Sequence, residues 1–170
     1  MADAELLFAE HRQGVFRYLC RLVGRVEAAQ DLTQEVFLRV SRAGVPASDP
    51  AGARAWVFRI ARNLALNHLR DTRRQPVPAP PADRTAPAVQ ELAVALAQAL
   101  ASLGDLDRDV FLLREAAGLS YGEIASACDI SVDAVRARLY RARNELRVAL
   151  DWPLSLRRQS PVSLNGGEWT

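Results

Sequence analysis

The segment around residues 119–146 places the strongest constraint on the fold, because it carries the signals that start two helices in succession. Ser120 followed by Glu123 forms a capping box, which predicts a helix over Tyr121–Ala127. A turn over Cys128–Ile130 follows, and Ser131 is a suitable N-cap for a second helix. This order predicts a helix-turn-helix.

The second of these helices has two contrasting faces when its residues are placed at about 100° intervals. Its apolar stripe contains Val132, Val135, Leu139, Ala142, Leu146 and Leu150. The other side and its flanks carry the hydrogen-bond donors and cations that suit a DNA groove. The candidate DNA-binding residues there are Ser131, Asp133, Arg136, Ala137, Arg138, Tyr140, Arg141 and Arg143. An ordinary solvated helix would show a similar pattern. However, five arginines lie within residues 136–147, whereas residues 92–130 contain six acids and two arginines, and this concentration favours a phosphate-facing surface.

Helical periodicity dominates the rest of the chain, and no segment alternates as a strand does. One helix is expected to end at Gly24, and others are expected over 27–42, 53–70, 91–103 and 108–117. Residues 73–90 hold five of the nine prolines and predict an extended linker. The predicted fold is all-α, with two small helical domains (1–74 and 92–150), a Pro-rich linker (75–91) and a disordered tail (151–170).

Composition argues against several other classes of protein. The cysteines, Cys20 and Cys128, lie 108 positions apart and show neither zinc-ligand spacing nor a disulfide framework. We therefore expect no metal site, no cofactor and, without a catalytic constellation, no enzymatic activity. The chain contains no run of about 18 apolar residues and no signal peptide, so a cytoplasmic protein without membrane insertion is expected. All 22 basic residues are arginine, whose forked donors suit phosphate and guanine.

The predicted helix at 53–70 offers a second nucleic-acid surface. One face is apolar, whereas the other is basic with two asparagines, and a tryptophan lies near its edge. Such groups can bind exposed bases and the backbone of an opened single strand. A solvated arginine face, with the tryptophan packed under the preceding loop, is the alternative interpretation. The candidate residues are Trp56, Arg59, Arg62, Asn63, Asn67, Arg70 and Arg73.

Three motifs occur in a characteristic order: DLTQEVFLR from Asp31, AWVFRIARNLALNHLR from Ala55, and the helix-turn-helix. Together they make residues 11–150 resemble the extracytoplasmic-function (ECF) sigma factors, which direct bacterial RNA polymerase to promoters. The resemblance implies a partner surface for the clamp helices of the largest polymerase subunit at Asp31, Gln34, Glu35, Leu38 and Arg39.

The same resemblance assigns the predicted helix at 53–70 to the −10 promoter element, where Asn63 would hold a flipped base. It assigns the helix-turn-helix to the −35 element. It also implies contact with the flap of the second-largest polymerase subunit and inhibition by an anti-sigma factor. One departure from the family pattern is Asp129, which replaces the usual glycine of the turn and can adopt a left-handed conformation there at modest cost.

Three alternatives stay open at this point. A helix-turn-helix regulator that does not associate with core polymerase could sense a ligand through its first domain. A response regulator would need a receiver domain with alternating strands, which the first 74 residues do not predict. A helical protein-binding adaptor would show no salt-dependent association with DNA.

Overall fold

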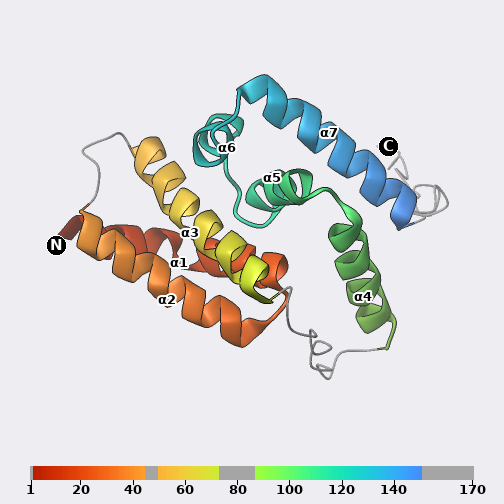
Figure 1. Cartoon of the computed structure of the whole chain (residues 1–170), viewed down its shortest axis with the longest axis horizontal. Coiled ribbons are helices and arrows are strands. Elements are labelled where there is room, and N and C mark those ends of the chain that lie inside the picture. Colours follow the sequence, from red (N-terminus) through yellow and green to blue (C-terminus); the bar gives the residue numbers. More distant parts are fainter. Residues whose placement is uncertain (1, 45–49, 73–86, 151–170) are drawn as a thin grey trace, which may run out of the picture.

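The computed structural model describes residues 2–44, 50–72 and 87–150, and every regular element within these ranges is an α-helix (Figure 1). The helices are α1 (Ala2–Val23), α2 (Val26–Ala43), α3 (Pro50–Thr72), α4 (Pro87–Ser102), α5 (Asp105–Glu115), α6 (Tyr121–Cys128) and α7 (Val132–Ala149). The prediction of an all-α fold is confirmed for the described residues.

Helices α1, α2 and α3 pack against one another and form the first domain. The apolar faces predicted for α2 and α3 point inward, and their core residues include Val36, Val40, Phe58 and Ala61. Helix α1 ends where expected: Gly24 has φ 71°, a left-handed conformation that favours glycine, and its N–H donates to the Cys20 carbonyl at 3.1 Å. The second domain consists of α4 to α7, and α7 packs against α4, α5 and α6.

Three helices begin three or four residues earlier than the sequence pattern predicts. Helix α3 starts at Pro50 rather than residue 53, α4 at Pro87 rather than residue 91, and α5 at Asp105 rather than residue 108. Proline is well suited to the first position of a helix, because that position donates no intrahelical hydrogen bond. Reading both prolines as loop residues was therefore wrong, and residues 87–91 belong to α4 rather than to a linker. The rest of the predicted linker (73–86, including Arg73) and the predicted tail (151–170) lie outside the described residues.

The two domains are not separate bodies on a tether, as the sequence suggested, but pack against each other. Helix α6 lies along α3, and α5 contacts α1, so α5 and α6 stand between α3 and α7 in Figure 1. The buried apolar residues of both domains form one continuous cluster. Periodicity along a chain shows which face of each helix is apolar, but it carries no information on which domain covers that face.

Candidate nucleic-acid interface

The helix-turn-helix is built by local hydrogen bonds that the sequence predicted. The Ser120 side chain accepts from the Glu123 N–H, and the Glu123 carboxylate accepts from the Ser120 N–H at 2.6 Å, which completes the capping box of α6. Asp129 ends the helix in the left-handed conformation, with φ 56° and ψ 50°. The Ser131 side chain accepts from the Ala134 N–H at 3.1 Å and caps α7. These caps set the angle at which α7 leaves the turn.

Helix α7 buries its apolar stripe and exposes a polar face. Val135, Leu139, Ala142 and Leu146 are buried, as expected, whereas Val132 and Leu150 at the two ends of the stripe are half-buried. Tyr140, on the face predicted to contact DNA, is 70% exposed. The other members of the predicted recognition set that are exposed are Ser131, Asp133, Arg136, Ala137, Arg141 and Arg143, whereas Arg138 is half-buried.

Two arginines of α7 are bound by one carboxylate of α5. Asp107 accepts from Arg138 Nη1 at 2.6 Å and from Arg141 Nε and Nη2 at 3.1 and 3.2 Å. Burial disfavours the charge on Asp107, but the hydrogen bonds from Arg141 and Arg138 outweigh it and hold the pKa of this carboxyl below its ordinary value. The carboxylate is therefore ionised near neutral pH and clamps α7 to α5.

These contacts divide the predicted recognition set. Arg143 also has a partner, since its Nη2 donates to the Glu115 carboxylate at 2.9 Å. Within the ranges that the structure describes, Arg136 pairs with its helix neighbour Asp133 alone, at 2.8 Å on an exposed surface. The face around Arg136, Ala137 and Tyr140 is consequently the part of α7 most available to a groove. The sequence pattern did not predict Asp107 as a partner, because helical periodicity does not show which helices pack together.

Residues predicted to bind the −10 element fall into two groups on α3. Trp56 and Asn63 line a surface hollow of about 490 Å³ between α2 and α3, together with Ile60, Arg39, Arg42 and Ala43. Asn67 and Arg70 are exposed farther along the helix. Arg59 and Arg62 instead face the second domain, where they bind the Ser126 carbonyl and the Asp109 carboxylate.

The hollow brings together groups that one sequence motif does not contain. Trp56 supplies an aromatic surface, Asn63 an amide with donors and an acceptor, and Arg39 and Arg42 positive charge. Arg39 also pairs with Glu35 at 2.7 Å, one turn away on α2. It was predicted as part of the polymerase-binding face, and the structure places it at the border between that face and the hollow.

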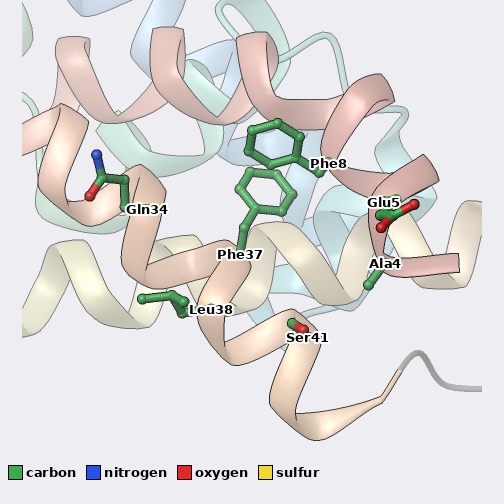
Figure 2. A pocket seen from close by; sticks show the side chains of 7 residues that line it. All are labelled: Ala4, Glu5, Phe8, Gln34, Phe37, Leu38 and Ser41. Carbon is green, nitrogen blue, oxygen red and sulfur yellow. The ribbon is translucent and has the colours of Figure 1, made fainter. Parts of the chain in front are cut away.

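The residues predicted to bind polymerase lie on α2 beside an apolar groove. Figure 2 shows Leu38 and Gln34 of α2 next to the rings of Phe8 and Phe37, which meet edge to face at a centroid distance of 5.0 Å. The groove has a volume of about 450 Å³ and Leu38 is 50% exposed. Asp31 and Gln34 line a neighbouring hollow between α1 and α2. Phe8 was missed because the predicted motif lies entirely on α2.

The fold and its surfaces define a class of protein: an all-helical DNA-binding protein with a helix-turn-helix domain and a second domain that carries an aromatic and basic hollow. Residues 7–75 match the family described as Sigma-70 region 2, and residues 93–146 match Sigma-70, region 4. Within the described residues, no helix has the length and apolar character needed to cross a membrane.

Similar proteins agree with these matches. The chain is 35% identical over 143 residues to the ECF RNA polymerase sigma factor SigC of Mycobacterium tuberculosis, covering 79% of this chain and 76% of the relative. It is 34% identical over 158 residues to ECF RNA polymerase sigma factor SigE of Mycolicibacterium smegmatis, covering 86% and 61%. The chain therefore belongs to the family of ECF RNA polymerase sigma factors.

Two solved structures share the fold. CnrH in complex with the cytosolic domain of CnrY has a TM-score of 0.69 at 27% identity, covering 89% of each chain. The sigma factor RpoE of Bartonella quintana, in complex with the anti-sigma factor NepR, has a TM-score of 0.68 at 22% identity, covering 89% of this chain and 98% of that one.

Proposed function

We propose that the hollow between α2 and α3 binds an unstacked base of the −10 promoter element. The observation that carries this proposal is the meeting of Trp56, Asn63 and two arginines in one surface hollow. An aromatic ring can stack on any base, an amide can hydrogen-bond to a base edge, and guanidinium groups attract the phosphates on either side. Taking a base out of the duplex costs a few kcal/mol, which these contacts and polymerase must offset.

The two asparagines of the −10 set provide a matched pair of variants for the test. Asn63 lines the hollow, whereas Asn67 is exposed one turn farther along α3 and is not among its lining residues. Promoter opening by the reconstituted holoenzyme is measured by permanganate reactivity of unpaired thymines. Asn63→Ala should reduce opening by about tenfold, equivalent to about 1.4 kcal/mol, and Asn67→Ala should reduce it much less. Equal effects of the two variants would refute the assignment.

Helix α7 is proposed to read the −35 element in the major groove. The exposed face around Arg136, Ala137 and Tyr140 supports base contacts, while the arginines at its flanks support contacts to the phosphates, which position the helix without reading sequence. Arg141 is only partly available to DNA. Two nitrogens of its guanidinium group donate to Asp107, although its side chain remains 52% exposed.

The groove between α1 and α2 is proposed to bind a helix of core polymerase. Leu38, Phe8 and Phe37 offer an apolar floor, and Gln34 and Glu5 offer a polar rim. This combination suits the helix-in-groove mode of recognition, in which a partner helix buries its apolar stripe. In this scheme the chain supplies promoter specificity in the cytoplasm, and polymerase performs nucleotide addition.

A protein inhibitor is also proposed for this chain. The solved relatives RpoE and CnrH were determined in complexes with NepR and with the cytosolic domain of CnrY. Core polymerase binding by the purified protein, followed by runoff transcription on genomic fragments, tests the whole proposal. Failure to bind core polymerase would favour a helix-turn-helix regulator that acts without it.

A further inference from the structure

One carboxylate of α5 is fixed at the flank of the proposed recognition helix. Asp107 lies in the first turn of α5, where the helix dipole favours an acid, and its side chain is 12% exposed. From its more buried side, the half-buried Arg138 donates through Nη1 to Asp107 Oδ1 at 2.6 Å. The carboxylate is therefore held in place by a partner that solvent reaches only in part.

The same carboxylate binds one edge of the Arg141 guanidinium. Arg141 Nε donates to Asp107 Oδ2 at 3.1 Å, and Arg141 Nη2 donates to Asp107 Oδ1 at 3.2 Å. Two parallel hydrogen bonds fix the plane of a guanidinium group as well as its position, which a single bond does not. Arg141 is thus held in one orientation although its side chain is exposed.

The other edge of this guanidinium is directed away from Asp107. The group is planar and rigid, and Nη2 carries two hydrogens, one along the side edge with Nε and one on the end edge with Nη1. Because Asp107 binds the side edge, the end edge retains two parallel donors. A guanine base offers the matching pair of acceptors, O6 and N7, in the major groove.

The position of Arg141 on α7 suits such a contact. Residues four positions apart lie on one helix face, and long side chains on a helix lean toward its N-terminus, so Arg141 extends over the turn that holds Ala137. Ala137 is exposed and its side chain is a single methyl group, which leaves the guanidinium room to reach a base edge. The N-terminal part of a recognition helix is the part that contacts bases.

We infer that Asp107 is a specificity-determining residue for the −35 element, because it holds Arg141 with the end edge toward the groove, where the two donors select a guanine. Asp107 itself does not touch DNA in this arrangement and is a positioning residue. The inference rests on the proposed reading of the −35 element by α7. It adds that a residue of α5 determines how an arginine of α7 reads a base.

The expected effect is on the choice of base more than on total DNA binding. A bidentate contact to the correct base discriminates about 5-fold to 150-fold against a wrong one. Without Asp107 the Arg141 guanidinium keeps its charge but samples several orientations, in which it binds phosphates that carry no sequence information. Loss of Asp107 should therefore weaken the preference for one base pair.

Four variants of the full chain separate orientation from charge. Asp107→Asn removes the charge that fixes Arg141, whereas Arg141→Ala removes the guanidinium and identifies the base pair that it reads. Arg141→Lys keeps the positive charge but has no edge that forms two parallel bonds. Glu115→Gln is the matched control, because it neutralises another α5 carboxylate that binds an arginine of α7, through one hydrogen bond from Arg143 at 2.9 Å.

Base preference is measured by transcription with the reconstituted holoenzyme. The templates carry one genomic promoter that the wild type transcribes, with its −35 region randomised, and each transcript is identified by a sequenced barcode. The ratio of transcript to template counts gives the preference for each base at each position. Because a preference is a ratio, it does not depend on how much of a destabilised variant is folded.

We expect Arg141→Ala and Arg141→Lys to lower the preference for a G·C pair at one position. Asp107→Asn should lower the preference at the same position by about fivefold or more, and it should have no further effect there in a chain that also carries Arg141→Ala. Glu115→Gln should keep the wild-type profile. Asp107→Asn with wild-type preferences, with a stronger preference, or with a change at a position that Arg141 does not read would overturn the inference.

The same experiment tests the proposed function separately. A wild-type holoenzyme without any preference in the randomised region would refute the reading of the −35 element by α7. A wild-type preference that depends on Arg141 but not on Asp107 would refute only the positioning role of Asp107.

Discussion

Replacing Asp107 by asparagine tests whether one carboxylate clamps α7 to α5. The side chain is only 12% exposed and accepts from Arg138 Nη1 at 2.6 Å. Hydrogen bonds to charged groups contribute about 1.5–3 kcal/mol, so Asp107→Asn should lower the free energy of unfolding by about 2 kcal/mol. The bonds from Arg141 add little to this free energy, because the Arg141 side chain is 52% exposed and ion pairs in solvent contribute little.

The pH dependence makes this prediction specific to the charge. The pKa of Asp107 in the folded protein lies below its ordinary value of 3.8. An acid with a depressed pKa stabilises the folded state fully above its unfolded-state pKa, and this contribution is lost as the pH falls through the folded-state pKa. The difference between wild type and Asp107→Asn should therefore be constant near neutral pH and shrink below pH 3.8.

Urea unfolding followed by circular dichroism, from pH 7 down to about pH 3, measures this difference. Asp133→Asn is the control, because its ion pair with Arg136 lies on the exposed side of α7 and should contribute far less. A destabilisation by Asp107→Asn that persists unchanged at the lowest pH would show that packing rather than charge is responsible. No destabilisation at neutral pH would refute the clamp itself.

Three further changes probe the other surfaces. Arg141→Ala should weaken −35-dependent transcription in runoff assays while core binding stays intact; equal loss of core binding would count against its assignment to DNA. Leu38→Asp should reduce co-purification with core polymerase, since it places a charge in the apolar floor of the groove, and unaltered co-purification would exclude that groove as the contact. Asp129→Ala should lower the free energy of unfolding by about 1 kcal/mol, because alanine is strained in the left-handed conformation, whereas Asp129→Gly should be tolerated. Urea denaturation measures both variants, and a less stable Asp129→Gly than Asp129→Ala would contradict this reason.

Local features of the chain were predictable wherever neighbouring residues decide the structure. The capping box of Ser120 and Glu123, the cap at Ser131 and the left-handed turn at Asp129 all follow from groups within three or four residues of one another. The buried stripe of α7 was predictable for the same reason, since helical geometry alone brings its members to one face. Helix starts at Pro50 and Pro87 were misjudged because proline marks both loops and first helical turns.

The candidate surfaces were only partly predictable. Trp56 and Asn63 lie on one helix, but the arginines that complete their hollow come from α2. Phe8 joins the α2 groove from α1, although no motif on α2 refers to it. In both cases the missing residues come from another helix, and periodicity within one helix does not specify its neighbours.

The sequence by itself determined the helical class, the helix-turn-helix with its caps, and the identity of the basic faces, because these depend on contacts between residues close in the chain. Only the tertiary structure decided which arginines are available. Arg59, Arg62 and Arg70 carry the same charge, yet docking of α5 and α6 half-buries Arg62 against Asp109 and binds the still exposed Arg59 to the Ser126 carbonyl, whereas Arg70 is exposed farther along α3. The physical reason is that Asp109 lies 47 residues from Arg62 and 91 from Tyr18, so only packing between the domains brings these groups together.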